Sequence, residues 1–134
     1  MIKKINHIGL AVHSIAKALE VFRDALGLQV ERTELIEDQG VKVAFLPLEG
    51  IHLELLEPID ETGPVARFLR RKGQGVHHVC LEVDDIEAVL SALQQRGVRL
   101  VDERPRIGAG GIKIAFLHPS STRGILLELC EESK

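Results

Sequence analysis

Two histidines occupy matching positions in a sequence that repeats itself. His7 lies in the alternating apolar stretch Ile-Asn-His-Ile-Gly-Leu-Ala-Val at residues 5–12, and His78 lies 71 residues later in the similar stretch at 75–83. Residues 41–46, Val-Lys-Val-Ala-Phe-Leu, recur at the same offset as Ile-Lys-Ile-Ala-Phe-Leu at 112–117. Two separate matches at one offset indicate a duplicated module.

Each repeat also carries one glutamate in its last predicted strand. These glutamates are Glu54 and Glu128, and because side chains alternate along a strand, Glu54 shares a face with His52. A carboxylate within such an apolar run is costly to bury unless it is paired, neutralised or bound to a metal. Two imidazoles and two carboxylates suit a divalent metal such as cobalt, manganese, iron, nickel or zinc. If a pseudo-twofold brings the modules together, the predicted ligands are His7, Glu54, His78 and Glu128.

Both residue types have a structural alternative. A lone strand histidine is commonly a satisfied structural residue, and a lone strand glutamate commonly faces solvent. The repeat-related pairing of all four residues favours the metal site. His52 could reach the same cavity but has no counterpart in the second repeat, whereas His77 matches Asn6 and lies on the opposite strand face from His78.

A second candidate region could contact substrate. The loop at 104–111 reads Arg-Pro-Arg-Ile-Gly-Ala-Gly-Gly, and its glycines permit close backbone approach, as at Gly110, while Arg106 could meet a carboxylate or phosphate. The alternative is a flexible hairpin loop with solvated arginines. His118 replaces Pro47 at the repeat position, and it could contact substrate or build the turn at the end of its strand.

The elements that must position these residues follow a repeated pattern, strand–helix–strand–strand–strand. Ser14 is a good N-cap for the first helix, Gly27 ends it, and Asp84 or Asp85 caps the helix of the second repeat. We predict strands at 4–12, 28–36, 41–48, 51–57, 76–83, 98–103, 112–118 and 125–130, with a short helix at 64–71. The class is α+β, with one domain over 1–134: module one at about 4–58, a linker helix region at about 59–74 and module two at about 75–131.

Composition excludes several function classes. The chain of 134 residues has 45% hydrophobic and 28% charged residues, which is ordinary for a soluble globular protein. A formal net charge of −3 argues against a nucleic-acid partner, and no apolar run is long enough to span a membrane. The N-terminus lacks a basic-then-apolar export segment, and Cys80 and Cys130 lie in apolar strands. We therefore expect a cytoplasmic protein with reduced, buried cysteines.

With these residues in place, the sequence resembles the vicinal oxygen chelate superfamily and, within it, the methylmalonyl-CoA epimerases. The resemblance covers nearly the whole chain. It implies a U-shaped mixed β-sheet, formed by two tandem βαβββ modules, around a central metal site. The stretches that carry it are residues 5–12, 53–58, 75–79, 103–111, 116–119 and 124–129, of which the last three look specific to the epimerases.

The resemblance also implies roles for individual residues. His7, His78 and Glu128 match metal ligands, and Glu54 matches a fourth ligand that is glutamine in some epimerases. The implied metal is cobalt, with manganese, zinc, nickel or magnesium as alternatives. Some epimerases carry a catalytic glutamate on the third strand, where this sequence has Val43. The sequence departs from the pattern there, because valine cannot move a proton.

The implied activity is metal-dependent epimerisation of methylmalonyl-CoA by proton abstraction at carbon 2 through a metal-stabilised enolate. Glu128 is the expected acid–base group on one side and Glu54 the best remaining candidate on the other. The family tends to form homodimers. Two alternatives stay open: a glyoxalase-type lyase or isomerase acting on a glutathione adduct, and a metal-free drug-sequestering protein of the same fold.

Overall fold

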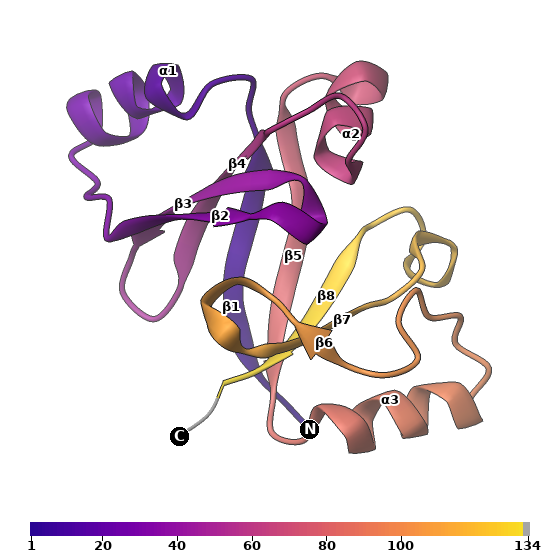
Figure 1. The fold of residues 1–134 in the computed structure, drawn as a ribbon. Helices are drawn as coiled ribbons and strands as arrows, with labels where there is room; N and C mark the ends of the chain where they lie inside the picture. Colours follow the sequence, from indigo (N-terminus) through magenta and orange to yellow (C-terminus); the bar gives the residue numbers. More distant parts are fainter. Residues whose placement is uncertain (133–134) are drawn as a thin grey trace. The chain divides into compact units, whose positions relative to one another are not determined.

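The computed structural model describes residues 1–132 and contains eight strands and three α-helices (Figure 1). The strands are hydrogen-bonded in the order β2-β3-β4-β1-β5-β8-β7-β6, with parallel and antiparallel neighbours. This confirms the α+β class and the mixed sheet. Among residues 1–132, none of the helices has the length and the apolar character that a membrane-spanning segment needs. The elements, in chain order, are β1 (Ile2–Ala11), α1 (Ile15–Leu19), β2 (Arg32–Ile36), β3 (Val41–Pro47), β4 (His52–Pro58), α2 (Pro64–Lys72), β5 (Gly75–Val83), α3 (Ile86–Gln95), β6 (Arg106–Ile107), β7 (Lys113–Phe116) and β8 (Leu127–Glu131).

The chain divides into two compact units. The N-terminal unit is His7–His77, and the C-terminal unit consists of Met1–Asn6 with the residues from His78 onward. In the N-terminal unit β2 and β3 are antiparallel, β3 and β4 are antiparallel, and β4 and β1 are parallel. In the C-terminal unit β5 and β8 are parallel, and β8, β7 and β6 are antiparallel neighbours.

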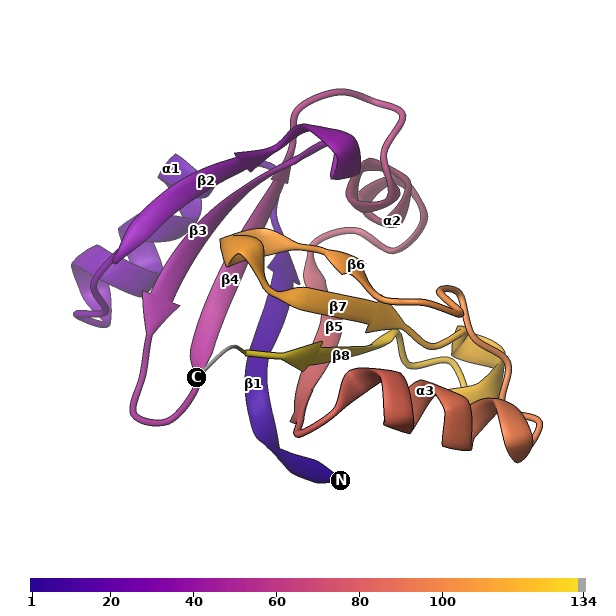
Figure 2. The same cartoon turned by 60° about the horizontal axis from the view of Figure 1, so that its bottom comes forward.

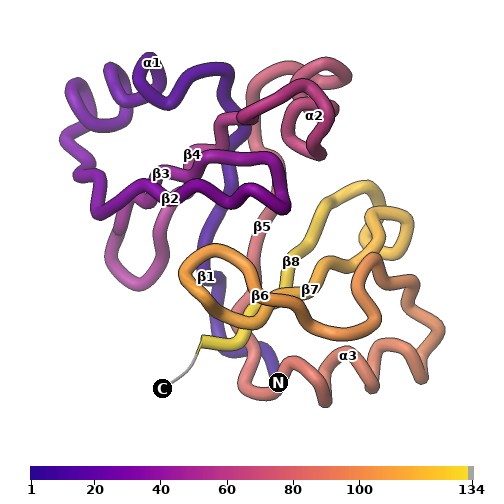
Figure 3. The backbone as a smooth tube through the Cα atoms, viewed as in Figure 1, coloured from indigo at the N-terminus to yellow at the C-terminus, as the bar shows by residue number. Residues whose placement is uncertain are grey.

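Local sequence explains where α1 begins and ends. The Ser14 hydroxyl accepts a hydrogen bond from the Lys17 backbone N–H at 3.2 Å, which satisfies one of the orphan donors of the first turn. The helix then widens into a π-helix over Glu20–Ala25, in which the Leu26 N–H bonds back to the Val21 carbonyl. Gly27, with φ of 83°, ends it as predicted. Figure 3 traces the helical stretch as one continuous coil.

One helix covers one sheet face in each unit. The face of β3 and β4 that carries Leu46 and Leu55 packs on α1, and the face of β8 that carries Leu129 packs on α3 (Figure 2). Each fully buried leucine contributes about 1.5–3 kcal/mol relative to an exposed one. The remaining members of these two clusters are Val12, Ile15, Leu19 and Ala44 in the first, and Val83, Ile86, Val89, Leu90, Ala115 and Leu117 in the second.

Strand alternation therefore directs the predicted site residues to the opposite faces. Glu54 is one residue from Leu55, so it points away from α1, and Glu128 is one residue from Leu129, so it points away from α3. Cys80 and Cys130 are buried, as the sequence predicts, and they pack with Ile114 in a small cluster of their own.

Two predicted strands differ from the structure. The strand predicted at 98–103 is absent apart from a single bridge between Leu100 and Leu117. The Asp102 carboxylate accepts the Phe116 N–H at 2.9 Å, so a side chain takes the place of a ladder partner. The strand predicted at 28–36 starts only at Arg32, because the chain leaving the π-helix is still bonded to it through Leu28.

Candidate metal centre

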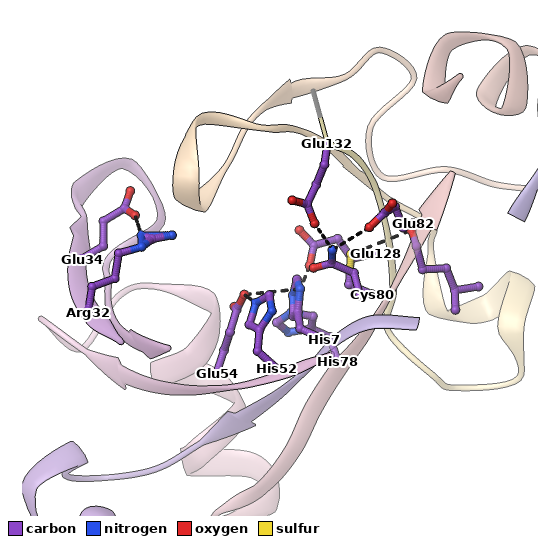
Figure 4. Close-up of polar contacts among 12 residues, drawn as sticks. His7, Arg32, Glu34, His52, Glu54, His78, Cys80, Glu82, Glu128 and Glu132 are labelled. Atoms are coloured by element: carbon purple, nitrogen blue, oxygen red, sulfur yellow. Dashed lines mark hydrogen bonds and ion pairs between the residues drawn. The ribbon is translucent and has the colours of Figure 1, made fainter. Parts of the chain in front are cut away.

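Glu54 is the centre of a buried polar group in the N-terminal unit. Its Oε2 lies 3.3 Å from His7 Nδ1 and 3.0 Å from His52 Nε2. The two histidines are register partners on the parallel strands β1 and β4, and Glu54 follows His52 by two positions on the same face. Figure 4 shows all three side chains pointing toward one another.

The two imidazoles differ in exposure. The side chains of His7 and Glu54 are 5% and 7% exposed, whereas that of His52 is 26% exposed. The rings of His7 and His52 stack with centroids 5.1 Å apart and planes inclined by 26°, and the Phe45 ring tilts against His52 at 5.7 Å. His52 therefore forms the more accessible edge of a buried arrangement.

The C-terminal unit holds a second buried histidine–glutamate pair. His78 Nε2 lies 3.0 Å from Glu128 Oε1, and the two side chains are 6% and 7% exposed. His78 comes from β5 and Glu128 from β8, and the Phe116 ring packs edge-on against His78 at 5.8 Å. The sequence repeat thus corresponds to a structural one, with one such pair in each unit.

The donor set fits a divalent cation. One ligand atom from each of His7, His52 and Glu54 lies within 4.8 Å of the others, and imidazole with carboxylate suits Zn, Co, Mn, Fe or Ni. Burying a carboxylate is expensive unless a positive charge or hydrogen bonds compensate for it. A bound cation would supply that compensation for Glu54.

The other candidate residues lie in the described chain as follows. Val43 is buried on β3, so this strand provides no acid or base at that position. The Arg106 guanidinium is half-exposed, pairs with Asp102 at 3.2 Å and lies over the Phe116 ring. His118 Nδ1 accepts the Ser120 N–H at 3.1 Å, which is a turn-building contact.

The glycine-rich loop turns tightly over Ala109–Gly111, with Gly110 outside the helical conformation. Gly110 and Gly111 have φ values of 75° and 76°, which favour glycine. Gly108 is needed for another reason, since a Cβ there would lie 2.6 Å from the Ile114 side chain.

A buried polar pair in the C-terminal unit was not anticipated from the sequence. Asn6 donates to Glu82 Oε1 at 3.0 Å and also contacts Glu132, and Lys3 pairs with Glu82 at 3.3 Å. Burial acts to raise the pKa of Glu82, but the hydrogen bonds from Asn6 and Lys3 outweigh it, so the net pKa is lowered. Strand alternation could have indicated this contact in part, because Asn6 directly precedes His7 and therefore projects from the opposite face of β1.

The sequence is similar to a known protein family and to named epimerases. Residues 6–116 match the family model of the glyoxalase/bleomycin resistance protein/dioxygenase superfamily. The ethylmalonyl-CoA/methylmalonyl-CoA epimerase of Cereibacter sphaeroides is 39% identical over 96% of this chain and 98% of the relative.

Solved structures of methylmalonyl-CoA epimerases have the same fold as this chain. The methylmalonyl-CoA epimerase of Mycobacterium tuberculosis aligns with a TM-score of 0.94 and 34% identity over 99% of this chain and 90% of that one. A variant of the Streptomyces coelicolor methylmalonyl-CoA epimerase, in complex with 2-nitronate-propionyl-CoA, aligns with a TM-score of 0.93 and 36% identity over 100% of both chains.

Proposed function

The chain belongs to the glyoxalase/bleomycin resistance protein/dioxygenase superfamily and, within it, to the methylmalonyl-CoA epimerases, and we propose that it interconverts (R)- and (S)-methylmalonyl-CoA. It is an isomerase of the racemase and epimerase class. The observation that carries the proposal is sequence identity with these epimerases over nearly the full length, together with a buried histidine–glutamate pair in each unit.

The proposed ligands of one divalent cation are His7, Glu54, His78 and Glu128. Their support is the burial of both pairs and the short distances within them. Cobalt is the proposed metal, with manganese, zinc, nickel and magnesium as alternatives. When bound, the cation would stabilise the negative charge of the enolate that forms when carbon 2 loses its proton.

Two carboxylates are proposed to move the proton. One removes the carbon-2 proton, the electron pair passes to the thioester oxygen, and the second group returns a proton to the opposite face. Glu128 is proposed on one side and Glu54 on the other. Val43 supports this assignment because it leaves that position of the third strand without an acid or base. Full turnover by a Glu54→Gln variant would remove Glu54 from this role.

Substrate contacts are proposed for Arg106, Gly110 and His118. The half-exposed guanidinium of Arg106 could meet the carboxylate or a phosphate of the substrate, and Gly110 lies in a tight turn. His118 uses Nδ1 in the turn, and its Nε2 is the nitrogen proposed to face the substrate.

A cytoplasmic location and a homodimer complete the proposal. The location rests on the two cysteines, which are buried in apolar strands and not spaced as a disulfide framework. The dimer rests on the tendency of the family alone.

Chiral analysis of methylmalonyl-CoA tests the proposed function. The full-length protein is stripped of metal, reloaded with Co²⁺ and incubated with one epimer. We expect the other epimer to appear only with the loaded protein. No conversion would refute the proposal, and glutathione hemithioacetals tested in parallel would then identify a glyoxalase-type activity.

A further inference from the structure

We propose that His52 is a positioning residue that fixes the Glu54 carboxylate for cation binding. This inference rests on the metal-binding role proposed for Glu54. His52 precedes Glu54 by two positions on β4, so both side chains project from the same face, and His52 Nε2 lies 3.0 Å from Glu54 Oε2. His52 is outside the ligand set proposed above, although one of its ring nitrogens lies within 4.8 Å of ligand atoms of His7 and Glu54.

The direction of this hydrogen bond follows from the acceptor. A carboxylate oxygen accepts, so in this contact the hydrogen lies on His52 Nε2, which donates it to Glu54 Oε2. A ring nitrogen that bears a hydrogen has no lone pair for a metal. While it donates to Glu54, this nitrogen orients the carboxylate, and that is the role that we assign to His52.

Within the described residues, two histidine nitrogens lie close to the Glu54 carboxylate, and both face its Oε2. Oε2 faces His52 Nε2 and His7 Nδ1, which leaves Oε1 as the oxygen available to a cation. A glutamate side chain has three rotatable bonds, so a carboxylate fixed at one oxygen loses less freedom when the other binds an ion. Outer hydrogen bonds of this kind commonly raise metal affinity 10–100-fold.

The surroundings of His52 hold its ring in place. It stacks on His7 on one side and tilts against Phe45, whose own ring lies 3.9 Å from the Arg32 guanidinium carbon. A ring packed in this way presents its N–H in a fixed direction. The second repeat has Leu126 at the position that matches His52. Because leucine cannot donate a hydrogen bond, this positioning of a glutamate by a histidine two residues earlier belongs to the N-terminal unit.

Three substitutions separate positioning from packing. His52→Leu removes the donor, while His52→Gln keeps an N–H at a similar reach. His13→Leu makes the same chemical change at an exposed histidine of the N-terminal unit, outside the proposed centre. Each full-length protein is checked by circular dichroism, stripped of metal and titrated with Co²⁺ by calorimetry, and the absorption spectrum of the bound Co²⁺ is recorded.

We expect H52L to bind Co²⁺ about 10–100-fold more weakly than wild type, with the Co²⁺ bands unmoved. H52Q should return to within about threefold of wild type, and H13L should match wild type, since only loss of the donor weakens positioning. Wild-type affinity in H52L would overturn the proposal. Displaced Co²⁺ bands in H52L would also overturn it, because they would make His52 a ligand.

The same samples distinguish this inference from the proposed reaction. A wild-type protein that binds Co²⁺ in a His52-dependent way but does not epimerise methylmalonyl-CoA supports the positioning role and refutes the substrate. A wild-type protein that epimerises the substrate without binding Co²⁺, Mn²⁺ or Zn²⁺ overturns the positioning role and leaves the substrate in place.

Discussion

Replacing Glu128 with glutamine tests whether its carboxylate transfers the proton. Glutamine has nearly the same shape and can still bond to His78, whose Nε2 lies 3.0 Å from Glu128 Oε1, but it cannot act as a base. Because the Glu128 side chain is only 7% exposed, bulk water has little access to replace it. The substitution therefore isolates the charge and the proton-transfer capacity from the packing.

The expected loss follows from the role of the group. A positioned general base contributes about 10²–10⁴-fold to a proton transfer, which corresponds to about 3–5 kcal/mol of activation free energy. We expect kcat of E128Q at saturating Co²⁺ to fall by a factor in this range in both directions. The metal-free protein should not melt at a lower temperature than wild type, because a neutral amide costs less to bury than a carboxylate.

Glu131→Gln is the matched control. Glu131 lies three residues further along β8 and caps α3 by accepting the Ile86 N–H at 2.8 Å, a contact that an amide oxygen also makes. E131Q should retain wild-type kcat. A kcat of E128Q within about tenfold of wild type at saturating metal would refute proton transfer by Glu128.

Three further predictions concern stability, each measured by urea unfolding. The pKa of Glu82 is lowered in the folded protein from its ordinary value of 4.5, so the stability that Glu82 contributes is present above pH 4.5 and is lost as the pH falls through the folded pKa. We therefore expect the unfolding midpoint of E82Q to fall less steeply than that of wild type between pH 7 and 3. Parallel pH profiles of the two proteins would contradict this. Gly108→Ala should cost about 1–3 kcal/mol, because the new Cβ would lie 2.6 Å from Ile114; an unchanged midpoint would show that the side chain moves freely. Asp85→Ala should cost about 1 kcal/mol by removing the acceptor for the Ala88 N–H, which Asp85→Asn should largely keep.

Local signals in the sequence predicted most of the fold. The helix caps at Ser14 and Asp85 and the stop at Gly27 all involve groups a few positions apart. The order of strands and helices followed from the repeat. The strand predicted at 98–103 was wrong because Asp102 bonds to the Phe116 N–H, and the sequence pattern does not show this competition.

The candidate site was predictable in part. Parity along β4 placed His52 and Glu54 on one face, and the structure puts them in contact. The repeat predicted the corresponding pair of His78 and Glu128. The bond between Asn6 and Glu82 joins residues 76 positions apart and has no counterpart in a local pattern, so only the fold could reveal it.

The most direct test of the central claim is hydrogen–deuterium exchange at carbon 2 of methylmalonyl-CoA in deuterated water, followed by mass spectrometry. The metal-stripped protein and the same sample reloaded with Co²⁺ are compared. Exchange that vanishes without metal and returns with Co²⁺ is the predicted result, because it requires a metal-dependent enolate. No exchange by the Co²⁺-loaded protein would contradict the assignment as an epimerase of this substrate.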